Sequence, residues 1–313
     1  MKLYLTKNLT LYVGLLMVFS SVAFKFNHHR NIDQHTIFHK KIKIAIIDTG
    51  VDINHTFLQD SLWVNPGESG IDNQGRLKSV NNIDDDGNGL VDDVNGWNFA
   101  SNTNDVKDYS GHGTHIAGII KTNILNINAN VDYEFMILKY YNKGINGREQ
   151  EKSFLKALSY AIDMGVDIIN VSAGGRSRNS KEAKLLQKAK DKGITIVAAA
   201  GNKRELDKDQ LFYPAAYEYS NIISVVATNM SGKILGTSNQ NYNKWNTFEN
   251  GSHIYSSLPN NKFGYMTGSS QATAAVTAKM ACQEYESVKN VIQRLHSQRQ
   301  ANVRISSKLL HNL

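Results

Sequence analysis

The sequence predicts a doubly wound α/β fold, in which a mainly parallel sheet carries helices on both faces. The first observation is a set of short, β-branched apolar runs at 42–47, 166–171 and 194–200, typical of strands buried on both faces. The second is that segments with helical periodicity separate these runs. Because parallel strands need long crossover connections, usually helices, this alternation predicts a parallel sheet.

The remaining elements follow in order along the chain. Further strands are expected at 135–140 and 222–227. A helix is expected at 153–164, where Leu155, Leu158 and Ile162 share one face. The next helix is expected to begin with Ser180 as its N-cap and to stop at Gly193.

Composition bounds the domain organisation. The chain has 313 residues, 41% of them hydrophobic, and only 3 prolines, so a large core without a proline-rich linker is expected. We therefore predict one domain over 41–313. The net charge of +7 comes partly from lysines and arginines near the two ends, without interleaved aromatic residues, so no nucleic-acid partner is predicted. The single cysteine, Cys282, forbids an intramolecular disulfide and is expected in the core.

The N-terminus is typical of a secretory signal. Lys2 and Lys7 precede an apolar run at 11–24, and small residues at Ser21 and Ala23 suit a cleavage site. We predict a signal peptide over 1–23 and an exported protein, secreted or periplasmic, with a membrane contact only if the signal stays uncleaved. The histidine-rich residues 24–40 fit no ligand spacing and are interpreted as a short connector or a vestigial pro-segment.

Asp48 and His112 are the first candidate functional residues. Asp48 ends the first buried strand, and open α/β sheets bind ligands at the carboxyl ends of their strands. His112 lies in the glycine-flanked sequence SGHGTH, just before an apolar helical pattern. It could act as a general base, or it could bind a metal together with His115 and Asp48. Spacing alone leaves both possibilities open.

The acidic loop around residue 84 follows the order of a calcium-binding loop. Oxygen donors recur at alternate positions around a glycine turn, as a hard cation requires. The predicted ligands are Asp84, Asp86, Asn88, Leu90 through its carbonyl, and Asp92. No helical pattern flanks the loop, so we predict a structural Ca²⁺ site rather than an EF-hand. The simpler interpretation is a solvated acidic turn.

Ser270 lies in the sequence GYMTGSSQATAAVTAKMA, which predicts a strand, a tight turn and a buried helix. A serine at a helix N-terminus sits among unpaired N–H groups, in a field that favours negative charge. Such a serine can be a nucleophile or an ordinary N-cap. Its partners elsewhere in the chain decide between the two.

Several polar residues are expected to meet at one edge of the sheet. Asp48, Ser172 and Asn202 follow the ends of predicted strands, and His112 and Ser270 begin predicted helices. Right-handed crossovers bring such strand ends together. A carboxylate, an imidazole, a hydroxyl and an amide are the groups that acyl transfer requires.

The sequence at this point resembles the subtilisin-like (subtilase, peptidase family S8) serine proteases. The motifs are IIDTGVD, SGHGTHIAG, NVSAGG, AAAGN and TGSSQATA, in the order of that family and spanning about 41–281. The resemblance implies that Ser270 attacks the scissile carbonyl, His112 is the base, Asp48 orients His112, and Asn202 stabilises the oxyanion. It implies no cofactor for catalysis.

The resemblance also implies polypeptide substrates, an extended binding cleft and a monomeric enzyme. The implied cleft walls are Ser172, Ala173, Gly174, Ala199 and Gly201. Pro214 matches a position where a cis peptide is usual in the family. Gln271 and Ala274 replace the usual methionine and proline after the nucleophile. We therefore predict a secreted serine endopeptidase that acts through an acyl-enzyme. The alternative is a catalytically inactive subtilase-like binding protein.

Overall fold

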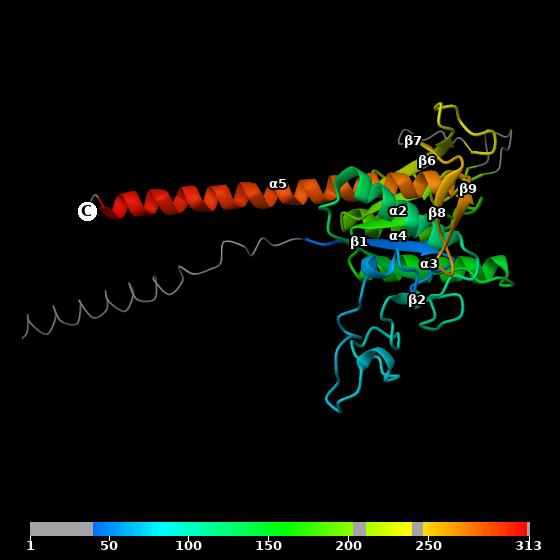
Figure 1. The fold of residues 1–313 in the computed structure, drawn as a ribbon, viewed down its shortest axis with the longest axis horizontal. Helices are drawn as coiled ribbons and strands as arrows, with labels where there is room; N and C mark the ends of the chain where they lie inside the picture. Colours follow the sequence, from blue (N-terminus) through cyan, green and yellow to red (C-terminus); the bar gives the residue numbers. More distant parts are fainter. Residues whose placement is uncertain (1–39, 203–210, 240–246, 312–313) are drawn as a thin grey trace, which may run out of the picture. The chain divides into compact units, whose positions relative to one another are not determined.

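A seven-stranded parallel sheet forms the centre of the protein in the computed structural model, which describes residues 40–202, 211–239 and 247–311. The strand order is β2-β3-β1-β4-β5-β6-β7 (Figure 1). The strands are β1 (Ile42–Asp48), β2 (Gly96–Asn98), β3 (Tyr133–Lys139), β4 (Ile168–Val171), β5 (Thr195–Ala199), β6 (Ile222–Thr228) and β7 (Thr247–Asn250).

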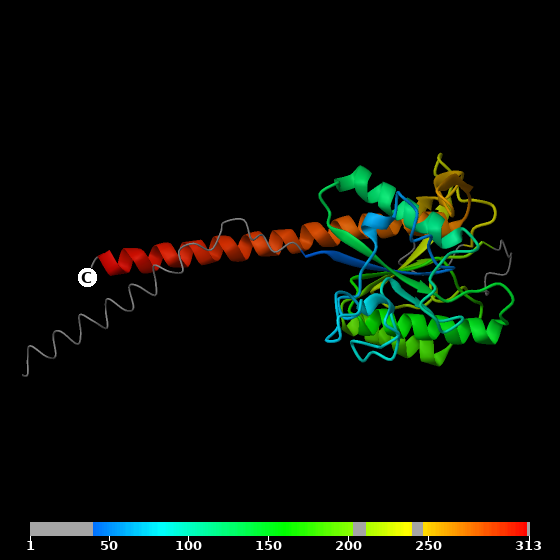
Figure 2. The ribbon, with the colours of Figure 1, turned by 60° about the horizontal axis from the view of Figure 1, so that its bottom comes forward.

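Helices cover both faces of this sheet, which confirms the predicted doubly wound α/β fold. The helices are α2 (His112–Asn128), α3 (Gly147–Asp163), α4 (Ser180–Asp191) and α5 (Ser269–His311). Figure 2 shows α2 and α5 on one side of the sheet and α3 and α4 on the other. All of these elements belong to one compact unit that begins at Lys40. None of the helices in the described residues is long and apolar enough to cross a membrane.

Strand β1 shows why the core has two halves. Successive side chains of a strand point to opposite faces, so Ile42, Ile44 and Ile46 pack in the core beneath α2 and α5. Ala45 and Ile47 pack in the other core, beneath α3 and α4. Both cores are closed to solvent, and this explains why the strand reads as a continuous apolar run rather than an alternating one.

The strand order places a topological switch beside β1. After β1 the chain forms β2 and β3 on one side and then crosses to β4 on the other, so β1 lies between β3 and β4. Ligands of open α/β sheets bind at the carboxyl ends of strands at such a switch. Asp48 ends β1, and Ser172 directly follows β4.

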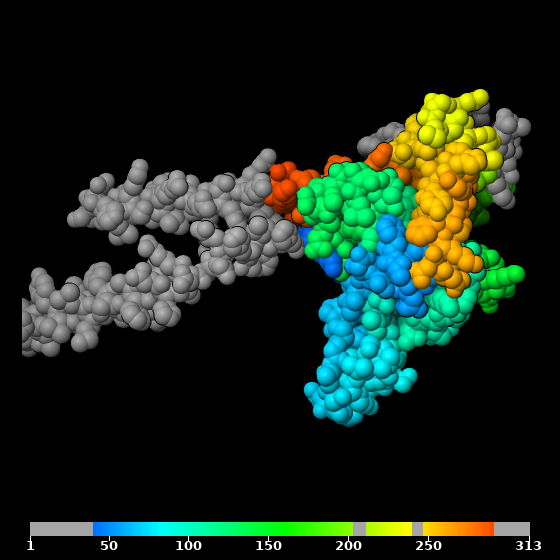
Figure 3. Space-filling model, in the orientation of Figure 1, coloured from blue at the N-terminus to red at the C-terminus, as the bar shows by residue number. Residues whose placement is uncertain are grey.

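Two smaller features flank the main sheet. The antiparallel pair β8 (Ile254–Leu258) and β9 (Lys262–Met266) lies beside α2 and leads into α5 (Figure 1). An irregular segment between β1 and β2 contains two 3₁₀ turns, η1 (Gln59–Ser61) and η2 (Lys78–Val80). In Figure 3 this acidic segment, coloured cyan, protrudes from the rest of the unit.

Two helix starts differ from the sequence-based prediction. Helix α3 begins at Gly147 rather than 153, because the side chain of Asn146 accepts from the N–H groups of Arg148 and Glu149 in a capping box. Helix α4 is capped by Asn179 and not by Ser180, which is its first helical residue. In both cases an asparagine one to several residues upstream takes the capping role.

Other local predictions are confirmed. Cys282 is buried, and the Tyr213–Pro214 peptide is cis. The predicted signal peptide (1–23) and nearly all of the predicted connector (24–40) lie outside the described residues.

Candidate active site

Asp48 and His112 form a hydrogen-bonded pair at the switch point. Nδ1 of His112 lies 2.7 Å from Oδ1 of Asp48, and the N–H of Thr49 donates to the same oxygen. Asp48 is 2% exposed, whereas the ring of His112 remains partly open to solvent. A Cβ on Gly113 would lie 2.1 Å from the carbonyl oxygen of Gly50, so a glycine is required for α2 to start this close to β1.

Asp108 fixes the turn that presents His112. Its Oδ1 accepts from the N–H groups of Ser110 and Gly111, and its Oδ2 accepts from the N–H and the hydroxyl of Thr114. The Thr49 hydroxyl donates to Asp108 Oδ1 and accepts from the N–H of Gly113. Asp108 therefore joins the end of β1 to the start of α2, a role that the sequence analysis did not assign.

The electrostatic surroundings of His112 favour its protonation. Burial disfavours the charged imidazolium, but attraction to Asp48, the hydrogen bond to Asp48 and the more distant charge of Asp108 together raise the pKa of His112 above its ordinary value. A proton accepted by His112 is therefore stabilised, as a general base requires.

Ser270 lies at the N-terminus of α5, next to the residue that follows β4. Its Oγ donates to the carbonyl oxygen of Ser172 at 3.1 Å, and Oγ of Ser172 donates to the carbonyl oxygen of Ser270 at 3.2 Å. Within the described residues, the Ser270 hydroxyl is thus engaged by Ser172 and not by His112. Catalytic hydrogen bonds are often formed only in the substrate complex.

Asn202 is held beside the same helix start. Its Oδ1 accepts from the N–H of Ser269 at 2.7 Å, while the residue itself is exposed. Because the oxygen of the amide is engaged, the remaining amide atom, Nδ2, can donate outward. The Ser269 N–H can donate only to the amide oxygen, so this hydrogen bond identifies which atom of the Asn202 amide is Oδ1.

The predicted cleft walls flank the start of α5. Among the backbone hydrogen bonds of the described residues, none involves the N–H or C=O groups of Ala173 or Gly174. On the other wall, Gly201 N–H donates to Oγ of Ser269. The ring of Phe212 lies between the walls, because a Cβ added at Gly174 or Gly201 would meet it within about 3 Å. Phe212 belongs to none of the five motifs, so the sequence analysis did not identify it as part of the cleft.

His115 does not join His112 in a metal site. It is fully buried, its Nε2 lies 3.2 Å from the carbonyl oxygen of Gly264, and burial lowers its pKa. The group of potential metal ligands that the described residues gather lies elsewhere, in the acidic segment. The structure thus favours the general-base interpretation of His112 over the metal-binding one.

The acidic segment gathers a different carboxylate set from the predicted one. Oxygens of Glu68, Asp86 and Asp93 lie within 4.8 Å of one another. Burial raises the pKa values of Glu68 and Asp93, and the charge of Asp86 raises both further. Glu68 is fully buried, and its Oε2 has no hydrogen-bond partner among the described residues.

Of the five ligands predicted from the sequence, Asp86 is the one in this carboxylate group. Asp84 instead caps the loop, because its oxygens accept from the N–H groups of Gly87, Asn88 and Gly89. The Asn88 amide donates to Asp86 and Asp93. Asp92 accepts from the N–H of Asn82. The spacing of a calcium-binding loop indicated this segment. Glu68 lies 18 residues before Asp86, outside that spacing, so no sequence pattern identified it as a candidate ligand.

Comparison with known proteins agrees with this architecture. Residues 39–304 match the Subtilase family (Peptidase_S8). Over 247 residues the chain is 31% identical to the major intracellular serine protease of Bacillus subtilis (strain 168), covering 77% of this chain and 68% of that protein. It is 28% identical over 271 residues to subtilisin-like protease 1 of Plasmodium falciparum (isolate 3D7), covering 79% of this chain and 37% of that protein.

Solved structures share the fold. A lanthipeptide protease aligns with a TM-score of 0.57 at 20% identity, covering 77% of this chain and 72% of that one. A cold-adapted subtilisin-like serine proteinase aligns with a TM-score of 0.55 at 22% identity, covering 78% and 76%.

The fold and the matched sequences together define the class of the protein as a serine peptidase. The chain belongs to the subtilase family, and it is a subtilisin-like serine endopeptidase that acts on polypeptides.

Proposed function

We propose that the protein hydrolyses peptide bonds through an acyl-enzyme formed on Ser270. The observation that supports this most directly is the 2.7 Å hydrogen bond between His112 and Asp48 at the edge where α5 begins with Ser269 and Ser270. A carboxylate, an imidazole and a hydroxyl in this relation form the triad of serine peptidases.

In the proposed reaction, the Ser270 hydroxyl leaves the Ser172 carbonyl and donates to Nε2 of His112. His112 takes the proton as Ser270 Oγ attacks the scissile carbonyl, and Asp48 stabilises the imidazolium. His112 then gives that proton to the leaving amine, which leaves an ester on Ser270. Water, deprotonated by His112, cleaves the ester and restores the hydroxyl.

Asn202 and the N-terminus of α5 are proposed to stabilise the tetrahedral intermediate. The Asn202 amide donates through Nδ2, and the N–H of Ser270 adds a second donor at the positive end of the helix. The substrate is proposed to lie as an extended strand along the edges of Ser172–Gly174 and Ala199–Gly201. The backbone groups of Ala173 and Gly174 have no backbone partner among the described residues, and this favours such a mode of binding.

A fluorophosphonate probe tests this proposal against the inactive binding-protein alternative. We expect covalent labelling of the folded protein, loss of labelling in Ser270→Ala, and no effect of a zinc-selective chelator. Well-folded protein that neither reacts with the probe nor cleaves peptides would instead support a non-catalytic binding protein.

We also propose a structural Ca²⁺ on Glu68, Asp86 and Asp93. Carboxylate oxygens are the ligands that Ca²⁺ prefers, and Glu68 offers a buried oxygen that lacks a hydrogen-bond donor. A Cβ on Gly67 would lie 2.3 Å from Cβ of Asp86, so the two chain segments approach closely only because residue 67 is glycine. The cation would offset the mutual repulsion of the three carboxylates.

Export remains a proposal based on residues 1–23. Two relatives are named intracellular serine proteases, those of Bacillus subtilis and Paenibacillus polymyxa. N-terminal sequencing of the mature protein decides the question, because a new N-terminus near residue 24 is expected after export and Met1 is expected without it.

A further inference from the structure

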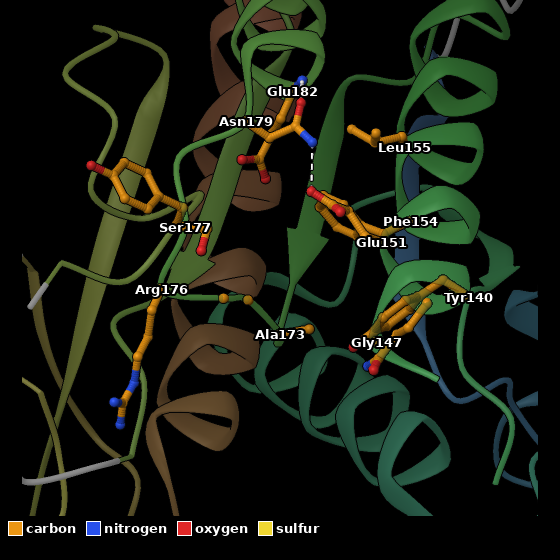
Figure 4. Close-up of a pocket in the computed structure, with 14 residues that line it drawn as sticks. Tyr140, Gly147, Glu151, Phe154, Leu155, Ala173, Arg176, Ser177, Asn179 and Glu182 are labelled. Atoms are coloured by element: carbon orange, nitrogen blue, oxygen red, sulfur yellow. Dashed lines mark hydrogen bonds between the residues drawn. The ribbon is translucent and has the colours of Figure 1, made fainter. Parts of the chain in front are cut away.

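A cavity of about 320 Å³ lies beside the proposed substrate cleft (Figure 4). One wall is the segment Ala173–Ser177, and the others come from α3, the first turn of α4 and Tyr213. Nothing in the proposed mechanism uses this cavity, although its wall begins one residue after Ser172, which contacts Ser270.

The position of the cavity makes it accessible to a substrate side chain. A peptide that pairs with the backbone groups of Ala173 and Gly174, which have no backbone partner in the described part of the chain, would run along the rim of the cavity. Alternate side chains of an extended strand point to the same side. One side chain on the amino-terminal side of the scissile bond would therefore point into this cavity.

Two carboxylates line the cavity. Glu182, in the first turn of α4, is only 6% exposed, and Glu151 of α3 is exposed. Figure 4 shows both acidic side chains directed toward the space between the two helices. Asn179 holds them in place, since its Nδ2 donates to Glu151 at 2.5 Å while its Oδ1 accepts from the N–H of Glu182.

Among the described residues, no cation acts on Glu182 within the cavity. Burial raises the pKa of Glu182 to about 7, and the charge of Glu151 raises it further, while the Tyr217 hydroxyl partly opposes this. Arg176 lines the cavity, but its side chain extends away from both carboxylates in Figure 4. Arg178 lies over the ring of Tyr217, 5.6 Å from its centroid.

The remaining lining suits the stem of a long basic side chain. Phe154, Leu155 and Ala173 supply apolar surface to the lining of the cavity. Lysine and arginine bury their methylene groups along such surface while the charged end reaches a polar partner. An apolar side chain would fill the same space but would leave Glu182 buried without a counter-ion, which is unfavourable.

We propose that this cavity is a specificity pocket for a cationic side chain, lysine or arginine, of the substrate, with Glu182 as the selecting residue and Glu151 as its support. This inference rests on the proposed peptidase function.

Paired fluorogenic peptides test it. Each pair carries lysine or norleucine at one position on the amino-terminal side of the cut, because norleucine keeps the stem without the charge. At pH 8 we expect kcat/KM to be at least about 10-fold higher for lysine at one position that is not adjacent to the scissile bond. Glu182→Gln should bring this ratio close to 1, and Glu151→Gln should lower it less.

Asp191→Asn is the matched control, because it removes one exposed negative charge at the opposite end of α4. It should keep the lysine preference of the unaltered protein. Thermal unfolding of each variant checks that it is folded. If Glu182→Gln does not fold, the preference of the unaltered protein and the response of Glu151→Gln still decide the matter.

The pH dependence of the same ratio adds a second readout. Both peptides of a pair depend equally on His112, so its titration cancels in the ratio. The groups that act on Glu182 directly are Glu151 from α3 and the Tyr217 hydroxyl. Tyr140, Tyr213 and Arg176 line the same cavity, with Arg176 directed away from Glu182, and Arg178 lies over the ring of Tyr217. The lysine preference should increase as pH rises through about 7, where Glu182 loses its proton.

The outcomes separate the two proposals. Cleavage of the peptides with a lysine-to-norleucine ratio near 1 at every position would overturn the pocket assignment and leave the peptidase proposal intact. The absence of both peptide cleavage and probe labelling would overturn the proposed function, and this inference with it.

Discussion

The Asp48–His112 pair and the Glu68–Asp86–Asp93 cluster both bury carboxylates, but they stabilise them differently. Oδ1 of Asp48 is hydrogen-bonded to Nδ1 of His112 and to the N–H of Thr49, and Asp48 raises the pKa of His112. In the cluster, the carboxylates face one another, and burial together with the charge of Asp86 raises the pKa values of Glu68 and Asp93. The first arrangement needs no cation for the proposed proton transfer, whereas the second is the site proposed for Ca²⁺.

The largest effect is expected from Ser270→Ala, which removes the proposed nucleophile served by the Asp48–His112 pair. We expect peptide hydrolysis to fall by roughly 10⁴-fold or more, because the nucleophile is lost while binding groups remain; this magnitude comes from subtilisin, a member of the same family. The measurement is kcat/KM on a fluorogenic peptide. Ser220→Ala, at an exposed position, is the control and should retain full activity. Residual activity within 10-fold of the unaltered protein would exclude Ser270 as the nucleophile.

Asp48→Asn probes the pairing itself. Activity should drop by about 10⁴-fold, because the amide favours the wrong tautomer of His112. Asp48 raises the pKa of His112, and the unprotonated ring is the base, so the unaltered protein should gain activity as pH rises through a midpoint above 6.5. In Asp48→Asn this midpoint should move to lower pH.

The pH profile of kcat/KM provides this measurement, with Asp132→Asn at an exposed position as the charge-matched control. An unchanged midpoint in Asp48→Asn would show that the two residues are not coupled.

Asn202→Ala tests the proposed oxyanion donor. We expect kcat to fall about 10²–10³-fold with little change in KM, since the amide acts on charge that develops only in the transition state. Asn130→Ala, an exposed position remote in sequence, should leave both constants unchanged. A change confined to KM would assign Asn202 to ground-state binding instead.

Calcium should raise the thermal stability of the protein through the Glu68–Asp86–Asp93 cluster and not through the Asp48–His112 pair. At 100 times its Kd, Ca²⁺ should stabilise the folded state by about 2.7 kcal/mol and raise Tm by several degrees. Glu68→Gln and Asp86→Asn should each reduce this shift, because each removes a charged ligand. Thermal unfolding with and without Ca²⁺ measures it.

Two further variants sharpen the ligand assignment. Asp85→Asn removes a carboxylate of the same loop that interacts with Asn81 and Lys78, so it should keep the calcium response. If Asp84→Asn abolishes the response while Glu68→Gln keeps it, the ligand set predicted from the sequence is correct and the cluster is not the site.

The sequence alone predicted the fold class, which the structure confirms, and it proposed the members of the candidate site. Continuous apolar runs predict strands that are covered on both faces. Polar residues flanked by glycine next to such runs predict the ends of strands and the starts of helices. These are local constraints, so they located Asp48, His112, Asn202 and Ser270. Helix boundaries were less accurate, because Asn146 and Asn179 compete as caps with nearby residues.

Only the tertiary structure decided which side chains meet across long separations. Glu68 joins Asp86 through the folding of an irregular segment, and Glu151 meets Glu182 because α3 and α4 pack on the same face of the sheet. The turn built by Asp108 and the position of Phe212 between the walls are likewise products of packing. A periodic pattern records which face of an element is buried, but it does not record the partner that buries it.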